Sequence, residues 1–276
     1  QHGRKLLDGD TSAVDALKKD LAELRNRKIH LLKSAGFPED YLEPVYDCPD
    51  CKDTGYIGNK KCHCFKKAII GLLYDQSNIK KFPVEADFSN FRLDYYPVSH
   101  YDKKTERSSR SMMEDTLRIC HHFIDSFGTE FNNLFFYGDV GVGKTFLSTC
   151  IAKEIMNREY SVLYFSAPQL FNTLAKNAFD KNDIDAHNMC EYIFDCDLLI
   201  IDDLGTEYTN AFIASQFFTC INERLLHRKS TIISTNLSLE SLADLYTERS
   251  FSRITSRYSL LKIVGDDIRI KKKLEH

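Results

Sequence analysis

The sequence lacks any long apolar run and any strong excess of charge of one sign. No stretch approaches the roughly 18 apolar residues that are needed to cross a bilayer, which predicts no membrane contact. The amino terminus also lacks the charged, then apolar, then small pattern of a secretory signal. We therefore expect a cytoplasmic protein, and we expect residues 274–276 to be the remainder of a purification tag.

The charges nearly balance, with 37 Lys and Arg against 40 Asp and Glu and a formal net charge of −3. Global charge therefore does not by itself indicate a nucleic-acid partner. With 276 residues, of which 43% are hydrophobic, the chain can form one substantial core and a small second unit. We expect two domains, residues 1–80 and 81–273.

Nine cysteines are present, but they do not indicate a disulfide framework in a chain of this length. Five lie scattered in apolar segments and are predicted to be buried free thiols: Cys120, Cys150, Cys190, Cys196 and Cys220. The other four form two close pairs, Cys48 with Cys51 and Cys62 with Cys64. Such pairs can hold one tetrahedral Zn²⁺ in a closed structural site, the alternative being reduced thiols without metal. His63 could replace either neighbour, so the fourth ligand is open.

Ahead of this cysteine segment, residues 12–34 place Val14, Leu17, Leu21 and further leucines at helical spacing among Lys, Glu and Arg. This pattern predicts an amphipathic helix that ends before Gly36. Its leucine stripe could dock on a partner protein or pack on the small domain beside it.

The strongest motif follows an apolar strand at residues 133–137. Its glycine-rich turn ends in Gly-Lys-Thr, the pattern of a phosphate-binding loop. Glycines let backbone N–H groups approach the phosphates, and the helix that starts there adds its positive dipole end. We expect ATP or ADP to bind at Gly138, Asp139, Val140, Gly141, Val142, Gly143, Lys144, Thr145 and Phe146.

Helices and strands alternate after this loop, with strands predicted at 161–165, 197–201, 231–235 and 261–264. Continuous apolar strands between helices are typical of an α/β fold with a parallel sheet covered on both faces. Asp202 and Asp203 follow the second of these strands, where Asp202 can hold Mg²⁺ together with Thr145 and Asp203 can orient a water. Asn236 ends the next strand and could reach the γ-phosphate or cap a helix.

The order of these motifs, continued by Glu248–Arg253 and Gly265–Arg269, resembles the AAA+ ATPases of the bacterial helicase-loader group, DnaC/DnaI type, with the related IstB-like ATP-binding proteins. The resemblance implies a P-loop NTPase domain with a parallel sheet flanked by helices, preceded by a small zinc-binding helical domain. It further implies roles for four residues: Asp203 as catalytic base, Asn236 as sensor 1, Arg253 as arginine finger and Arg269 as sensor 2. Most such ATPases have Glu at the position of Asp203, and the shorter side chain is consistent with slow, switch-like hydrolysis.

The function implied is ATP-dependent loading of a replicative DNA helicase hexamer onto single-stranded DNA, with self-association through Arg253. Arg249 and Arg257 share the helical face of Arg253, so the sequence alone leaves open which of them reaches a neighbour. Lys176 and Phe179 are candidates for DNA contact, the alternatives being a surface lysine and a core phenylalanine. Rival functions are an IstB-like ATPase that assists a transposase, a P-loop small-molecule kinase, and a module that holds nucleotide without turnover.

Overall fold

The computed structural model describes residues 12–65, 68, 86–102, 105–180 and 182–274. Contacts divide the chain into two compact units, Gln1–Lys60 and Lys61–His276, which we describe separately. The domain boundary expected near residue 80 lies outside the described residues and stays a prediction. No helix among the described residues is long and apolar enough to cross a membrane.

The first unit contains the predicted amphipathic helix, α2 (Ser12–Ser34). Its leucine stripe is open, because Leu21, Leu24 and Leu31 are each more than half exposed. Just beyond the end of the helix, Gly36 has a left-handed φ of 80°, and Phe37 N–H donates to Leu32 O. The exposed stripe is therefore available for docking on a partner protein.

A short hairpin of two-residue strands, β1 (Tyr56–Ile57) and β2 (Lys60–Lys61), joins the two cysteine pairs. Among residues 48–64, apart from Lys61, the buried ones are Cys48, Cys51, Cys62 and Gly55. Strands this short bury almost nothing themselves, so the hairpin depends on its cysteines for a fixed shape.

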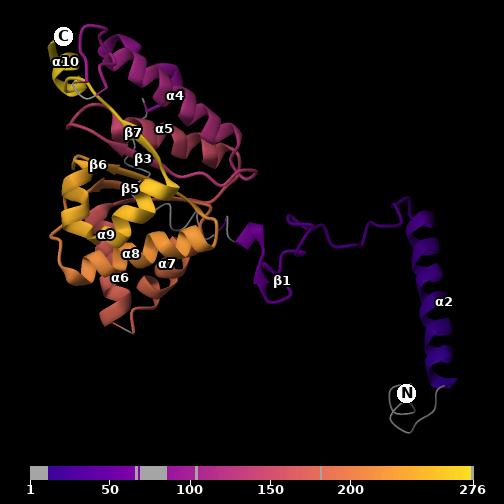
Figure 1. The fold of residues 1–276 in the computed structure, drawn as a ribbon. Helices are drawn as coiled ribbons and strands as arrows, with labels where there is room; N and C mark the ends of the chain where they lie inside the picture. Colours follow the sequence, from indigo (N-terminus) through magenta and orange to yellow (C-terminus); the bar gives the residue numbers. More distant parts are fainter. Residues whose placement is uncertain (1–11, 66–67, 69–85, 103–104, 181, 275–276) are drawn as a thin grey trace. The chain divides into compact units, whose positions relative to one another are not determined.

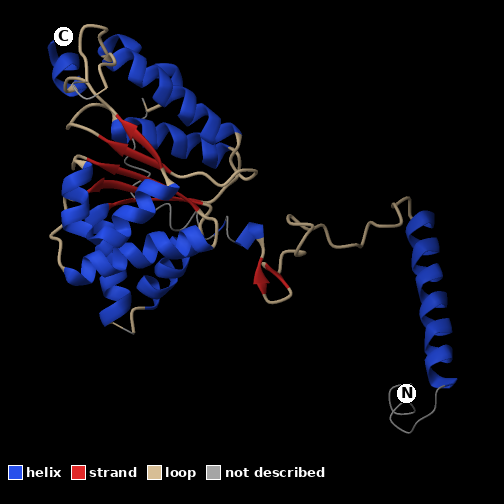
Figure 2. Cartoon of the chain, in the orientation of Figure 1, coloured by secondary structure: helices blue, strands red, loops and turns tan. Residues whose placement is uncertain are grey.

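The second unit is built on five parallel strands in the order β4-β5-β6-β3-β7 (Figures 1 and 2). The strands are β3 (Leu134–Tyr137), β4 (Val162–Ser166), β5 (Leu198–Leu204), β6 (Ser230–Thr235) and β7 (Ser259–Lys262). The helices are α4 (Ser109–Asp125), α5 (Lys144–Asn157), α6 (Ala167–Phe179), α7 (Ile184–Asp195), α8 (Ala211–Leu226), α9 (Leu239–Arg257) and α10 (Ile268–Leu274). Two 3₁₀ turns, η2 (Phe88–Asn90) and η3 (Leu93–Tyr95), precede α4.

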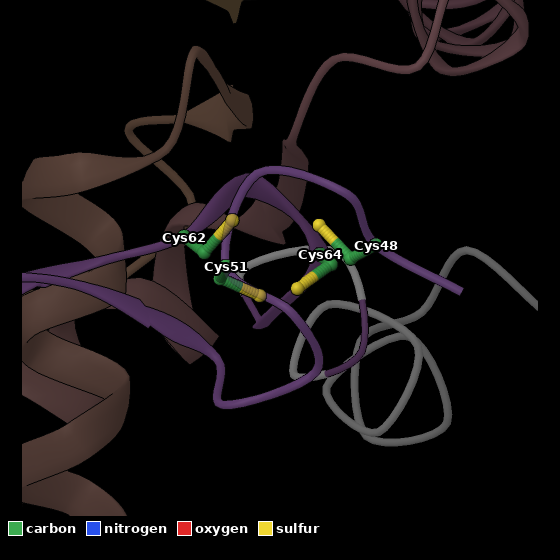
Figure 3. A group of neighbouring side chains, drawn as sticks. All are labelled: Cys48, Cys51, Cys62 and Cys64. Carbon is green, nitrogen blue, oxygen red and sulfur yellow. The ribbon is translucent and has the colours of Figure 1, made fainter. Parts of the chain in front are cut away.

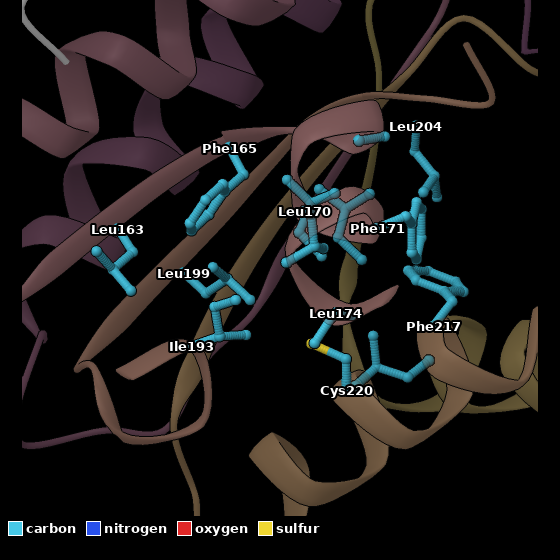
Figure 4. Close-up of a cluster of buried hydrophobic side chains, with 14 of the residues drawn as sticks. Leu163, Phe165, Leu170, Phe171, Leu174, Ile193, Leu199, Leu204, Phe217 and Cys220 are labelled. Carbon is cyan, nitrogen blue, oxygen red and sulfur yellow. The ribbon is translucent and has the colours of Figure 1, made fainter. Parts of the chain in front are cut away.

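The sheet is covered on both faces, α4 and α5 lying on one side and α6 to α9 on the other (Figure 1). Alternation along each strand sends neighbouring side chains into different cores. Phe135 and Leu163 join the α6–α9 side, whereas Phe136 and Tyr164 join the α4–α5 side. Figure 4 shows the first of these cores, in which side chains from the strands meet those from the helices. The predicted α/β fold with a parallel sheet is confirmed.

Strand β5 runs further than the sequence predicts. It continues through the two aspartates to Leu204, with a shift of register against β6 between Ile201 and Leu204. Asp203 has a left-handed φ of 55° at this irregularity. A bulge of this kind redirects a side chain at the end of a strand, and here it separates the directions of Asp202 and Asp203.

Candidate functional site

The phosphate-binding loop connects β3 to α5 and folds around its own lysine. Lys144 is 5% exposed, and its Nζ donates to Gly138 O at 2.8 Å and to Asp139 O at 2.6 Å. Burial lowers the pKa of Lys144, an effect that the charges of Asp203 and Asp202 oppose. The lysine is therefore a buried cation whose partners are backbone carbonyls, and a phosphate is a stronger partner that fits the same place.

The glycines of the loop allow other parts of the chain to approach it. A Cβ at Gly138 would lie 2.1 Å from Ile263 O, and one at Gly141 would lie 2.1 Å from Asp267 Cγ. Both glycines have positive φ, 145° and 77°. From the sequence, these glycines are expected only to let phosphate approach, whereas in the structure the segment before α10 also needs them.

Asp202 lies beside Thr145, as expected for a magnesium site. The Thr145 hydroxyl donates to Asp202 Oδ2 at 3.0 Å, and Asp202 is 6% exposed. A hydroxyl next to a carboxylate fits the oxygen ligands that Mg²⁺ takes at nucleotide sites. Two further hydroxyls, from Tyr164 at 2.7 Å and from Ser234, donate to the same carboxylate. Neither hydroxyl was predicted from the sequence.

Asp203 faces the cavity beside the loop together with Asn236. Its backbone N–H donates to Ser234 Oγ at 3.0 Å, which ties it to β6. Burial and the neighbouring charge of Asp202 raise the pKa of Asp203, while Lys144, Arg269 and a hydrogen bond with Asn236 oppose the shift. A carboxylate with a raised pKa at the carboxyl edge of a parallel sheet is a candidate general base.

The cavity has a volume of about 350 Å³ and extends from the phosphate loop to the segment before α4. Aromatic side chains form this far wall, where the Phe91 ring stacks on the Tyr96 ring with centroids 5.7 Å apart. The Tyr96 hydroxyl donates to Val142 O at 2.8 Å, which fixes the wall to the loop. A flat apolar wall next to a phosphate site suits a planar base. These aromatics could not be assigned to the site from the sequence, because Tyr96 lies 46 residues before its partner Val142 in the loop.

The predicted arginines occupy different positions. Arg269 on α10 lines the cavity and pairs with Asp267 through two hydrogen bonds, of 2.9 Å and 3.1 Å. Arg253 lies exposed on α9 and is not among the residues that line this cavity, and Arg249 and Arg257 are exposed on the same helix. Within one chain, therefore, the structure brings Arg269 to the site and leaves Arg253 outside it.

The residues considered for DNA contact lie near each other at α6. Phe179 is 76% exposed, and its ring lies 4.9 Å from that of Phe212, so a core role is excluded. Lys176 lines a second cavity of about 350 Å³ together with residues of α7. Both side chains are therefore accessible.

The four clustered cysteines come together, with their sulfur atoms within 4.8 Å of one another (Figure 3). A tetrahedral zinc with bonds of about 2.3 Å separates its sulfurs by about 3.8 Å, so the four thiols fit this ion. His63 is outside the group, although its Nδ1 lies 3.5 Å from Cys62 Sγ. Asp53 Oδ1 accepts from the Cys48 N–H at 2.8 Å and holds the first turn in shape.

A phosphate loop after the interior strand β3, a carboxylate pair at the end of β5 and this strand order define an AAA+ nucleotide-binding domain of the P-loop class. The family of IstB-like ATP binding proteins matches residues 76–276, and the chain belongs to this family. The predicted resemblance is confirmed. The cysteine segment lies before the matched region.

Relatives include proteins of DNA replication. The chain is 27% identical to the phage-like element PBSX protein XkdC of Bacillus subtilis (strain 168), over 80% of this chain and 83% of that protein. It is 29% identical to the replicative helicase loader DnaI of the same organism, over 41% of this chain and only 36% of that loader. A crystal structure of DnaI shares the fold, with a TM-score of 0.52 at 24% identity, covering 66% of this chain and 95% of that one.

Proposed function

We propose that this protein is an ATP-dependent helicase loader for DNA replication. It binds ATP with Mg²⁺, contacts single-stranded DNA and delivers a replicative DNA helicase hexamer to it in the cytoplasm. The contact between Thr145 and Asp202, on a loop that already holds Lys144, is the observation that carries the nucleotide part. Similarity to the replicative helicase loader DnaI supports a replicative helicase as the partner.

Hydrolysis is assigned to the residues at the end of the sheet. Lys144 binds the β- and γ-phosphates, Asp202 and Thr145 hold Mg²⁺, and Asp203 orients the attacking water with Asn236. Asp203 is one methylene shorter than glutamate, which favours slow turnover that acts as a switch. Arg269 contacts the γ-phosphate from within the chain once it exchanges its bond with Asp267 for the nucleotide.

Arg253 completes the site of a neighbouring copy. Its exposed position outside the cavity of its own chain suits a residue that acts across an interface. A cation that arrives from a second copy makes hydrolysis depend on assembly. Phe179 and Lys176 supply an exposed ring and a charge for single-stranded DNA.

The amino-terminal region docks on the helicase. Cys48, Cys51, Cys62 and Cys64 hold a structural Zn²⁺ that fixes the shape of the cysteine segment, and the exposed leucine stripe of α2 supplies an apolar surface. A second candidate function is assistance to a transposase. The family match covers the nucleotide domain and there supports a transposase helper as much as a helicase loader. The match begins at residue 76, so it does not include the cysteine segment.

The test is a co-elution experiment with the zinc-loaded full chain. We expect it to elute with a purified replicative helicase hexamer in the presence of Mg-ATP and to transfer the helicase to circular single-stranded DNA. The matched control is Cys51→Ser, which should lose the helicase and retain ATP. Elution with a transposase and not with any replicative helicase would overturn the loader in favour of the second candidate.

A further inference from the structure

The Asp202 carboxylate is held from both strands that flank β5. On the β4 side, the Tyr164 hydroxyl donates to Oδ2 at 2.7 Å. On the β6 side, the Ser234 hydroxyl donates to Oδ1. One oxygen is thus fixed by each neighbouring strand, and Thr145 of the phosphate loop meets the same group from α5.

The register of the sheet explains this convergence. Tyr164 pairs with Ile200, so Asp202 lies two residues further along β5 on the same face. On β6, Ile232 also pairs with Ile200, and Ser234 lies two residues beyond Ile232 on the same face. Three side chains from three strands therefore point toward the face that α5 covers, at the level where the phosphate loop begins.

We propose that Tyr164 is a positioning residue for the magnesium ion of the nucleotide site and that it acts through Asp202. A carboxylate offers about four lone-pair positions, and free rotation about Cβ–Cγ would spread them in all directions. The donors on Oδ2 and Oδ1 fix that rotation, so that the remaining lone pairs serve Thr145 and the ion with its waters. This inference rests on the proposed function, since it requires a magnesium nucleotide at this site.

The buried position of Tyr164 suits this role. Tyr164 is 5% exposed and its ring packs in the core on the α4–α5 side, where phenylalanine would fill the same space. Its hydroxyl satisfies the buried Asp202 carboxylate, which phenylalanine could not do. Groups that orient a metal-binding carboxylate typically change metal affinity by about 10- to 100-fold when they are removed.

The experiment compares Tyr164→Phe with the parent protein, using a fluorescent ATP analogue. Its affinity is measured first in EDTA and then during titration with Mg²⁺, and the Mn²⁺ resonance spectrum of the bound nucleotide is recorded. We expect unchanged affinity in EDTA, an increase of about 10-fold in the Mg²⁺ concentration at half-saturation, and a broadened Mn²⁺ signal. A role in packing alone would leave the metal titration and the spectrum unchanged.

Tyr246→Phe is the matched control, because it removes a buried tyrosine hydroxyl that has no partner among the described residues. It should leave the metal titration unchanged. Ser234→Ala is the second variant and should raise the Mg²⁺ requirement in the same direction as Tyr164→Phe. A parent-like metal titration in Tyr164→Phe would overturn the inference, whatever the result for Ser234→Ala, while Mg-ATP binding by the parent would preserve the proposed function. Failure of the parent to bind the analogue would overturn the function itself.

Discussion

The cysteine segment and the five-stranded domain achieve a fixed shape by different means. In residues 48–64, apart from Lys61, the buried side chains are three cysteines, around two strands of two residues each. The second unit has two apolar cores, one on each face of a continuous sheet. The four thiols can bind one structural zinc, which would replace a core where the chain is too short to bury one, whereas the wide sheet is stabilised by its two cores.

The difference predicts that the two regions fail independently. Removal of metal should unfold the cysteine segment and leave nucleotide binding intact, whereas a cavity in the core should destabilise the sheet and leave the metal bound. Each of the following substitutions changes either the cysteine segment or the five-stranded domain, and not both.

The largest effect is expected for Cys51→Ser, which removes a buried thiol from the cluster. Structural zinc sites contribute on the order of 10 kcal/mol at neutral pH, so the segment should lose its metal and its shape. Zinc content per chain and protease sensitivity between residues 48 and 64 measure this result, with ATP affinity unchanged. Cys190→Ala, which removes a thiol outside the cluster, is the control and should retain the zinc content of the parent. Full zinc occupancy in Cys51→Ser would contradict the four-thiol site.

The next effect is expected for Phe217→Ala in the core of Figure 4. Phe217 is fully buried against Phe171 and Tyr246, and truncation should lower the free energy of unfolding by about 3–5 kcal/mol. Urea denaturation measures the loss, while zinc content should stay at the parent value. The control Phe179→Ala removes an exposed ring and should cost less than about 0.5 kcal/mol. Equal losses in the two variants would refute the assignment of the core.

Asp203→Asn should lower ATP hydrolysis by about 10²- to 10⁴-fold with little change in ATP affinity, because a general base contributes that much. The raised pKa of Asp203 means that the charged form opposes folding at neutral pH. In the parent, the contribution of Asp203 to stability is present below the unfolded pKa and is lost as pH rises through the folded pKa. The variant should therefore be more stable than the parent at neutral pH and equally stable in strong acid.

Single-turnover hydrolysis and thermal unfolding across pH measure these two effects. Asp195→Asn, which alters an exposed carboxylate at the end of α7, is the control and should change neither. Parent-like turnover in Asp203→Asn would exclude Asp203 as the base.

The smallest of these effects is expected for Lys144→Ala. Hydrogen bonds to a charged group contribute about 1.5–3 kcal/mol, so ATP affinity should fall by about 10- to 100-fold. Stability should not fall, because the variant removes a buried cation whose pKa is lowered by burial. Isothermal titration calorimetry measures the affinity, and Lys153→Ala on the same helix is the control. Undiminished ATP affinity in Lys144→Ala would remove the basis of the proposed function.

Local patterns made much of the fold predictable. Apolar runs located the five strands to within a few residues, and the glycine-rich turn located the loop between β3 and α5. Alternation of helix and strand is itself a local signal, and it leads directly to a parallel sheet. The length of β5 was underestimated because two aspartates look like the end of a strand, although a bulge lets the strand continue through them.

The partners of the site residues could not be predicted in this way. Tyr164 and Ser234 lie 38 and 32 residues from Asp202, and only the order of strands in the sheet brings them to it. Arg224 is a second example, since a basic residue on a helix is expected to face water. It is fully buried and donates to Ile193 O at 2.7 Å and to Cys196 O at 3.1 Å, near the carboxyl end of α7. Such contacts depend on tertiary structure and leave no periodic signal.

The backbone bond from Ile268 N–H to Gly141 O, 3.0 Å long, has a mechanical consequence. It joins the start of α10 directly to the phosphate loop, without an intervening side chain. Lys271, Lys272 and Lys273 follow within the next turn. Because Lys271 donates to Tyr95 O at 3.0 Å and Lys272 lines the cavity beside the loop, this backbone bond also fixes positive charge of α10 at the edge of that cavity.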